Sequence, residues 1–300
     1  MTAGGSASPG AIAISATDSV HKTLAAIAHA LRDAGIEGAE TDARYLAQGV
    51  LGLDAASLLR DPDRLVGASA SQLAEAVRRR LAHEPVSRIL GQRDFYGRTF
   101  KVTPDVLDPR ADTETLVDLV LDIVRADERL QGAITIADIG VGSGAILVTL
   151  LAELPLARGI AIDVSPAALG VAVENARACG VDNRVTAVAT GGLDGITQPI
   201  DIIVSNPPYI VTSDIERLDA SVRQFDPRLA LDGGPDGLQI YREIARDISK
   251  IRRGCWIVLE FGAGQAADVE KIFSQFSVHK TITRTDLGGH TRVVALEIHC

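Results

Sequence analysis

The chain has 300 residues, of which 46% are hydrophobic, so it is long enough to bury a substantial core, and wholesale disorder is not expected. Its net charge of −9 argues against long-range attraction to a nucleic-acid backbone, and no apolar run approaches the length of a membrane span. The three cysteines are widely spaced and the six histidines are scattered, so neither a disulfide framework nor a metal site is predicted. We therefore expect a globular, cytoplasmic protein that does not associate with membranes.

The N-terminal part of the chain is predicted to be helical. Residues 1–16 are rich in small residues, lack a basic leader and are expected to form a disordered tail. From 17 to 90, apolar residues recur at helical spacing in three stretches, separated by loop residues such as Pro62 and Gly67. This pattern predicts a small helical bundle domain. The apolar residues that define the three helices are Val20, Leu24, Ile27 and Leu31, then Ala43, Leu46 and Val50, then Leu73, Val77 and Leu81.

The period changes between residues 91 and 108. Asp94-Phe95-Tyr96 and Thr99-Phe100-Lys101-Val102 read as two strands, and Gly97-Arg98 reads as the turn between them. We expect this β-hairpin to link the helical domain to a second domain that covers residues 109–300.

Strands and helices alternate after Pro109. Expected strands lie at 134–139, 159–163, 184–189, 201–205 and 255–261, with helices at 145–154, 166–179 and 237–250. A helix at 265–273 precedes two further strands, at 277–285 and 292–298, which a short glycine-bearing segment joins. The alternation predicts an α/β fold with a seven-stranded, mostly parallel, Rossmann-like sheet that ends in an antiparallel hairpin.

A glycine-rich loop follows the first strand of this domain. Its sequence is Asp138-Ile139-Gly140-Val141-Gly142-Ser143-Gly144, and glycines here let a ligand approach the backbone closely. A tight turn without a ligand is the alternative for the loop taken alone. A nicotinamide-binding fold also has glycines at this place, but the third glycine of the dinucleotide fingerprint is missing at its expected distance.

Acidic residues sharpen the prediction for this loop. Asp163 ends the next strand, where a carboxylate can accept hydrogen bonds from both ribose hydroxyls, and Ser165 is better placed than Asp163 to cap the following helix. Asp138 suits a ligand that carries an ammonium group and a sulfonium. We therefore expect an adenosyl ligand without a pyrophosphate.

The segment Asn206-Pro207-Pro208-Tyr209 lies at the carboxyl end of the predicted fourth strand, the edge where open parallel sheets bind ligands. Two prolines remove two N–H donors and leave carbonyls free to accept. An amide nitrogen is a poor nucleophile, but acceptors at the Asn206 side chain and the Pro207 carbonyl would fix both of its hydrogens and aim it at a sulfonium methyl. Tyr209 can stack on a flat substrate group. The alternative is a rigid loop with a buried tyrosine.

These motifs together resemble the release-factor glutamine methyltransferases, also called the HemK type, from about Thr41 to the C-terminus. The resemblance implies methyl transfer from S-adenosylmethionine to the glutamine side-chain amide in the Gly-Gly-Gln loop of peptide chain release factors. It also implies that the helical domain docks this protein substrate. The sequences that carry it are Glu84-Pro85, Leu90-Gly91, Phe100 to Pro104, Pro109-Arg110, Thr113-Glu114, the glycine loop, Asp163, Asn206 to Tyr209, Asp226-Pro227, Leu229 to Gly234, Asp236 to Leu238 and Tyr241.

The resemblance assigns roles to individual residues. Asn206 and Pro207 are expected to be catalytic, and Asn206, Pro207, Pro208 and Tyr209 to bind the substrate. No metal is implied. The expected cofactor-binding residues are Asp138, Gly140, Val141, Gly142, Ser143, Gly144, Asp163, Gly192 and Asn206.

A few positions depart from the family pattern. Gly192-Leu193 stands where an acidic residue and a large apolar one usually lie near the adenine. Ala111 replaces a usual proline, Asp108 an apolar residue and Asp226 a glutamate. None lies in the expected catalytic loop. They leave open a divergent paralogue with another protein substrate.

Other functions fit parts of the pattern. Adenine-amino methyltransferases of nucleic acids share the Asn-Pro-Pro-Tyr motif, although the acidic balance and the lack of a recognition domain count against a nucleic-acid substrate. A non-catalytic binding protein that retains the fold is a second alternative, and a nicotinamide dehydrogenase is a third. We expect a monomer.

Three features outside these motifs have simpler interpretations. Trp256 lies in a predicted central strand and is expected in the core. Arg242, Arg246 and Lys250 are spaced four apart on a helix and are expected to form a solvated face, with a docking surface as the alternative. Glu260 ends the fifth predicted strand, where lining the pocket and a packing role are both credible.

Overall fold

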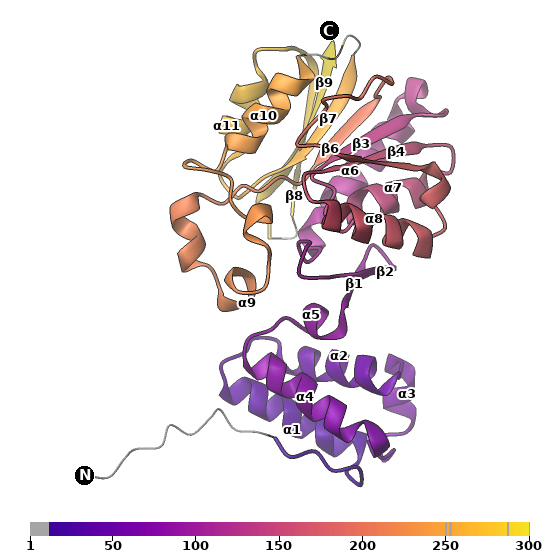
Figure 1. Ribbon diagram of the computed structural model, residues 1–300, viewed down its shortest axis with the longest axis vertical. Coiled ribbons are helices and arrows are strands. Elements are labelled where there is room, and N and C mark those ends of the chain that lie inside the picture. Colours follow the sequence, from indigo (N-terminus) through magenta and orange to yellow (C-terminus); the bar gives the residue numbers. More distant parts are fainter. Residues whose placement is uncertain (1–11, 250, 252–253, 287, 300) are drawn as a thin grey trace, which may run out of the picture. The chain divides into compact units, whose positions relative to one another are not determined.

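A computed structural model describes residues 12–249, 251, 254–286 and 288–299. The chain forms two compact units, one that ends at Gly91 and one that begins at Gln92 (Figure 1).

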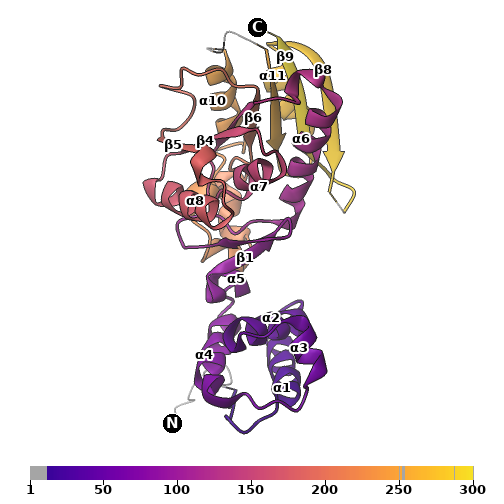
Figure 2. The same cartoon turned by 90° about the vertical axis from the view of Figure 1, so that its right-hand side faces the viewer.

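The first unit is a helical bundle with a core of its own. Side chains of the three longer helices meet in this core, where Ile27, Leu31, Leu46, Leu73 and Val77 are fully buried. The predicted bundle is confirmed, but two short helices were missed, because five or six residues cannot show a repeating apolar period. The helices, visible in Figure 2, are α1 (Val20–Asp33), α2 (Ala39–Leu51), α3 (Ala55–Arg60), α4 (Ala70–Leu81) and α5 (Val86–Leu90).

The segment that precedes α1 belongs partly to this unit. Ile12 and Ile14 pack against the helical core, and the backbone N–H of Ser15 donates to Asp18 Oδ2 at 2.8 Å. The prediction of a disordered tail is therefore wrong for residues 12–16, because two isoleucines can bury themselves against the bundle. The rest of that prediction, residues 1–11, lies outside the described residues.

The second unit opens with the predicted hairpin, formed by β1 (Gln92–Phe95) and β2 (Arg98–Lys101). Tyr96 and Gly97 form its turn with φ of 50° and 70°, as a two-residue turn of this kind requires. Phe95 and Phe100 contact each other edge to face and are buried in the main core of this unit. The hairpin is therefore an integral part of the second unit. The sequence had predicted residues 91–108 to be a separate linker.

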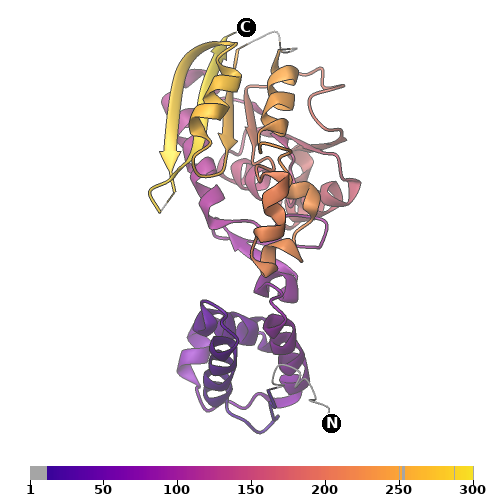
Figure 3. The same ribbon diagram turned by 90° about the vertical axis from the view of Figure 1, so that its left-hand side faces the viewer.

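A seven-stranded sheet forms the centre of the second unit, in the order β5-β4-β3-β6-β7-β9-β8. Neighbouring strands from β5 to β7 are parallel. β9 is antiparallel to both β7 and β8, and Figure 3 shows the terminal strands β8 and β9 in yellow. The predicted mostly parallel sheet with a terminal hairpin is confirmed. Its strands are β3 (Thr135–Ile139), β4 (Arg158–Asp163), β5 (Val185–Ala189), β6 (Ile202–Ser205), β7 (Cys255–Glu260), β8 (Ser277–Thr285) and β9 (Thr291–His299).

Helices cover both faces of the sheet (Figure 1). One face carries α6 (Glu114–Ala126), α7 (Ala145–Glu153) and α8 (Pro166–Ala178), and the other carries α10 (Gln239–Ile248) and α11 (Ala266–Phe273). The short helix α9 (Ala220–Arg223) lies in the connection between β6 and α10. Helix α6 was not predicted. Seven of its 13 residues are buried, and Asp118, Asp122 and Arg125 recur at helical spacing between them, so the sequence pattern of this helix was overlooked.

The strand order brings two distant loops together. β3 and β6 are neighbours at the centre of the sheet, and the chain leaves their carboxyl ends at Gly140 and Asn206. The buried hydroxyl of Ser205 donates to the carbonyl of Ile139 at 2.6 Å and ties the two strand ends together. The glycine loop and the Asn-Pro-Pro-Tyr segment therefore lie side by side at the topological switch point, where such sheets bind ligands.

Candidate active site

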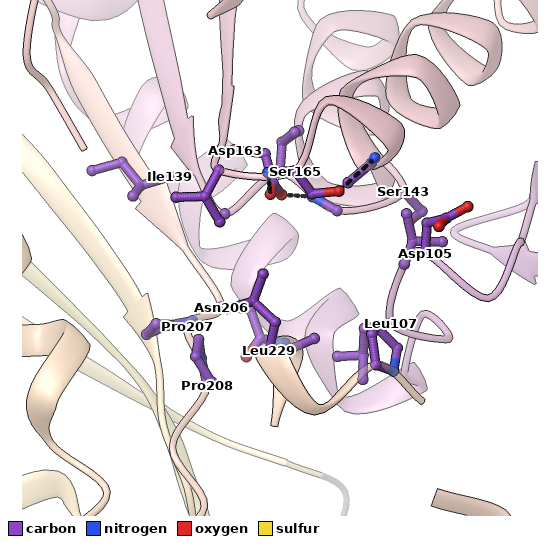
Figure 4. A pocket seen from close by; sticks show the side chains of 18 of the residues that line it. Asp105, Leu107, Ile139, Ser143, Asp163, Ser165, Asn206, Pro207, Pro208 and Leu229 are labelled. Carbon is purple, nitrogen blue, oxygen red and sulfur yellow. Dashed lines mark hydrogen bonds between the residues drawn. The ribbon is translucent and has the colours of Figure 1, made fainter. Parts of the chain in front are cut away.

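A cavity of about 500 Å³ lies at this edge of the sheet, within the size range of small-molecule sites. Asp163 and Ser165 stand on one side of it, and Asn206, Pro207 and Pro208 lie across from them (Figure 4). Most of the predicted site residues line this cavity. They are Gly140, Val141, Gly142, Ser143, Asp163, Asn206, Pro207 and Pro208.

Asp163 holds the glycine loop in place. Its Oδ2 accepts from the backbone N–H of Gly142 at 3.0 Å, and its Oδ1 accepts from that of Ser165 at 2.9 Å. Ser165 caps α8 by accepting from Ala168 N, as predicted. Gly140 and Gly142 have positive φ, and a Cβ at Gly140 would meet no atom within 4 Å, so the loop opens directly onto free space.

A buried asparagine connects the glycine loop to the hairpin. Asn175 on α8 donates from Nδ2 to the carbonyls of Ser143 and Lys101, and its Oδ1 accepts from Lys101 N at 2.7 Å. The loop position therefore depends on β2 as well as on the sheet. No local sequence pattern indicates this role, because the partners are 74 and 32 residues away from Asn175.

The Asn206 side chain has a defined orientation. Its Nδ2 donates to Thr113 Oγ1 at 3.1 Å, and none of the described residues donates to its Oδ1. The amide therefore keeps its oxygen as an acceptor at the cavity wall. Thr113, which also lines the cavity, had been noted only as part of a family motif.

A second segment braces the backbone after Asn206. Ile210 N donates to Leu231 O at 3.1 Å, Gly233 N donates to Ile210 O at 2.8 Å, and Thr212 N donates to Gly234 O at 3.0 Å. A Cβ at Gly233 would lie 2.8 Å from the carbonyl oxygen of Pro208, so only glycine fits here. The run Leu229 to Gly234, quoted above for the resemblance, therefore fixes the course of the Asn-Pro-Pro-Tyr loop.

Three predicted cofactor residues do not line the cavity. Asp138 is buried behind the loop, where desolvation raises its pKa to about 8. Gly144 faces Ala172, which a Cβ would approach to 3.2 Å. Gly192 faces Asp247, whose Oδ2 accepts from Leu193 N, and Gly191 forms the cavity wall in its place. Gly192 thus makes room for a carboxylate of α10, and its contact with a ligand stays a prediction.

Tyr209 also lies outside the cavity lining. Its ring packs beside Gly262 and against the core on the α10 and α11 side, and burial raises its pKa. Its carbonyl accepts from Gln265 Nε2 at 3.1 Å. Tyr209 is thus partly buried in a braced loop, and the stacking role expected of its ring stays a prediction.

The cavity wall contains an ion pair that the sequence analysis did not predict. Arg110 lines the cavity and donates to Asp226 Oδ2 at 2.6 Å, and the Asp226 side chain is only 1% exposed. Asp226 was noted as a departure from a family glutamate, and it still supplies the carboxylate that pairs with Arg110. Leu229, 63% exposed, forms an apolar part of the same wall.

Glu260 lies behind this wall, at the end of β7. It is 3% exposed, and its Oε2 has no hydrogen-bond partner among the described residues. Desolvation raises its pKa to about 7, against the opposing effects of hydrogen bonding by Thr113 and Asn206 and of the charge on Arg292. Glu260 does not line the cavity itself, but it touches two residues that do.

The remaining sequence predictions concern the core and the surface. Trp256 is buried in β7 as expected. Arg242 pairs with Asp236 and Arg246 is exposed, as a solvated face requires, whereas Lys250 lies outside the described residues. In the described part of the chain, no group of His, Cys, Asp and Glu suits a metal ion. The described helices also include none with the length and apolar character needed to cross a membrane.

Comparison with known proteins agrees with this geometry. Residues 22–91 match the family described as PrmC N-terminal domain, and residues 118–225 match the methyltransferase small domain. Among solved structures, the catalytic domain of hMettl16 in complex with a MAT2A 3′UTR hairpin has a TM-score of 0.53 at 16% identity. The two chains are covered to 77% and 81%, and the likeness shows a methyltransferase fold.

Curated relatives cover almost the whole chain. The release factor glutamine methyltransferase of Bradyrhizobium diazoefficiens is 42% identical over 93% of both chains. That of Rhodospirillum rubrum is 43% identical over 87% of this chain and 80% of its own, and that of Geobacter sulfurreducens is 39% identical over 88% and 91%. With this identity over both units, the chain belongs to the release factor glutamine methyltransferase family.

Proposed function

We propose that this protein transfers a methyl group from S-adenosylmethionine to the side-chain amide nitrogen of the glutamine in the Gly-Gly-Gln loop of peptide chain release factors. The observation that carries the proposal is the Asn206 amide, whose nitrogen is held by Thr113 while its oxygen stays available beside the glycine loop. Family membership supports the same substrate, because the relatives carry it in their names.

The residues present fit S-adenosylmethionine. Gly140 and Gly142 leave the backbone open to a ligand, and the Asp163 carboxylate at the cavity wall can accept from ribose hydroxyls. Asp138 lies behind the same loop, and a positive charge nearby would favour its ionised form. When bound, S-adenosylmethionine supplies a methyl group on a positively charged sulfur. Thr190 and Gly191 replace Gly192 as the proposed wall near the adenine.

The chain's own contribution to catalysis is positioning. Asn206 Oδ1 and the Pro207 carbonyl each accept one N–H of the substrate amide, so both hydrogens are fixed and the nitrogen lone pair points at the methyl carbon. With S-adenosylmethionine bound, the C–N bond would form as the C–S bond breaks, and the electron pair of the broken bond would go to sulfur. The same acceptors stabilise the positive charge that develops on nitrogen, and the surplus proton leaves to water afterwards.

The first unit has a separate proposed role. It carries its own core and matches the PrmC N-terminal domain, so we propose that it docks the release factor while the second unit methylates it. A substrate from the translation machinery is consistent with the cytoplasmic location that the cysteine pattern predicts.

Transfer of labelled methyl groups tests the proposal. The enzyme, labelled S-adenosylmethionine and a release factor are incubated together, with total RNA and DNA in parallel reactions. We expect label in the release factor, and none in a matched release factor whose Gly-Gly-Gln glutamine is changed to alanine. Label that enters nucleic acid but not protein would overturn the proposal in favour of an adenine-amino methyltransferase.

A further inference from the structure

We propose that Glu260 is a positioning residue which, together with Thr113, holds the Asn206 amide so that its Oδ1 faces the substrate nitrogen. The orientation of the amide is a property of the protein without substrate. Its effect on methyl transfer rests on the proposed function.

Thr113 provides the first part of the argument. It stands where the turn Ala111–Thr113 runs into α6, and its φ of −66° and ψ of −19° are already helical. Its side chain makes no hydrogen bond to the backbone of the first turn of α6, and Oγ1 accepts from Asn206 Nδ2 at 3.1 Å. The buried threonine hydroxyl therefore serves to hold a residue of the cavity wall.

Glu260 provides the second part. It follows Leu259, which pairs with Ser205 in the sheet, so Glu260 and Asn206 leave neighbouring strands at the same edge, and Thr113 and Asn206 both lower the pKa of Glu260. An ionised carboxylate is an acceptor only, so it favours the arrangement in which the Thr113 hydroxyl and the Asn206 NH2 turn their hydrogens toward it. Rotation of the Asn206 amide by half a turn would then set Oδ1 against a negative oxygen. The carboxylate therefore selects the orientation that the proposed chemistry needs.

The charges around Glu260 show why its ionisation matters. Arg292 is the cation that faces it, but Arg292 also pairs with Asp286 at 2.8 Å, and Asp112 adds a second negative charge. Tyr209 and Tyr241 are two further titratable neighbours, and the Tyr241 hydroxyl donates to the Glu260 carbonyl. A protonated Glu260 can donate to Asn206 Oδ1 and so release the amide from its fixed orientation.

A buried oxygen without a partner supports a role in the site for the Glu260 carboxyl group. Glu260 Oε2 has no partner among the described residues, and a buried oxygen without a partner is destabilising by about 1–3 kcal/mol. A glutamine or an apolar residue would pack at the end of β7 without a buried charge. The position is therefore better explained by its effect on Asn206 than by its contribution to the core.

The orientation can be tested without any substrate, by following the side-chain NH2 resonance of Asn206, assigned by its loss in Asn206→Ala. We expect this resonance to shift with a midpoint near the pKa of Glu260, about 7, in wild-type protein and in Glu297→Gln. Glu297→Gln is the matched control, because it removes another buried carboxylate from the neighbouring strand β9. The shift should vanish in Glu260→Gln. A resonance that titrates equally in Glu260→Gln, or not at all in wild type, overturns the proposal.

Kinetics with a release factor test the consequence for turnover. Thr113→Val should lower kcat about tenfold, the effect of one hydrogen bond, with the Kd of S-adenosylmethionine within a factor of about two. Thr113→Ser should restore turnover relative to Thr113→Val. The matched control is Thr149→Val, which removes a fully buried hydroxyl without a partner among the described residues, and it should keep the wild-type rate.

The pH profile separates positioning from mere stability. Wild-type kcat should rise from about pH 6 to about pH 8 as Glu260 loses its proton, and Glu260→Gln should be slower and flat over this interval. A Glu260→Gln enzyme with the wild-type profile, or Thr113→Val with full kcat, contradicts the proposal. A wild type that methylates no release factor defeats the proposed function, and the resonance test then decides on the orientation alone.

Discussion

Asn206 carries the central chemical role at the scale of single residues. Replacement by alanine removes an acceptor that is already oriented by Thr113, so kcat should fall on the order of 10²-fold or more while the Kd of S-adenosylmethionine changes little. Steady-state kinetics with a release factor, and calorimetry with the cofactor alone, measure the two quantities. Asn183→Ala is the control, because Asn183 is exposed and lies outside the cavity lining. Full turnover by Asn206→Ala would favour a non-catalytic role for the loop.

Asp138 makes a prediction about stability. Its pKa is raised from 3.8 to about 8, so between these values the folded chain keeps a proton that the unfolded chain has lost. By linkage, the free energy of unfolding then falls as the pH rises through this interval. In Asp138→Asn the group cannot ionise, and the fall from about pH 5 to about pH 8 should be shallower than in wild type.

Urea unfolding of the ligand-free protein at both pH values measures this difference. Asp182→Asn serves as the control, because it removes an exposed carboxylate and should keep the wild-type slope. Equal slopes in wild type and Asp138→Asn would show that Asp138 is ionised throughout.

Some residues of the candidate site could be predicted from the sequence and others could not. Asp163 and Asn206 were predictable, because Asp163 ends a strand, Asn206 directly follows one, and the carboxyl ends of parallel strands form the ligand edge. Glu260 and Arg110 were not assigned to the site, because their partners Thr113 and Asp226 are more than a hundred residues away in the chain. Gly192 was assigned to the ligand because nothing in the sequence shows that Asp247 occupies the adjoining space.

Among the structural elements, the segment that braces the catalytic loop yields the sharpest prediction. A Cβ at Gly233 would lie 2.8 Å from both the Pro208 carbonyl oxygen and the Tyr209 Cα, and backbone atoms must move to admit it. A displacement of about 1 Å in a positioning loop can lower the rate on the order of 10²-fold, so Gly233→Ala should lose kcat to that extent.

The control for this substitution is Gly170→Ala. Gly170 is exposed on α8, and a Cβ there meets nothing within 4 Å, so alanine should stabilise the helix by about 0.5–1 kcal/mol and leave the rate unchanged. Turnover and thermal unfolding of both variants give the comparison. Wild-type kcat in Gly233→Ala would mean that the brace does not set the loop position.

Elements were predictable where their pattern is local. The central strands are short, buried apolar runs that end at polar residues, and their predicted ends agree closely with the structure. Helix α6, which packs against the sheet and helix α7, was missed although its buried and charged residues alternate at helical spacing, so this omission was not forced by the sequence. The integration of the hairpin into the second unit rests on Phe95, Phe100 and Asn175, contacts that no local pattern encodes.

For the whole molecule, family membership spans both units. The match to the PrmC N-terminal domain covers the helical unit, and the relatives align over nearly the full length of this chain. The proposal therefore treats the two units as one enzyme, in which one binds the protein substrate and the other carries the cavity. The monomeric state remains a prediction from the sequence.

Mass spectrometry of a release factor after incubation with this enzyme and S-adenosylmethionine tests the central claim most directly. The account predicts one added methyl group, located by fragmentation on the side-chain nitrogen of the Gly-Gly-Gln glutamine, and a far smaller modified fraction with Asn206→Ala after the same incubation. A methyl group on any other residue, or an unmodified release factor in the presence of bound cofactor, would contradict it.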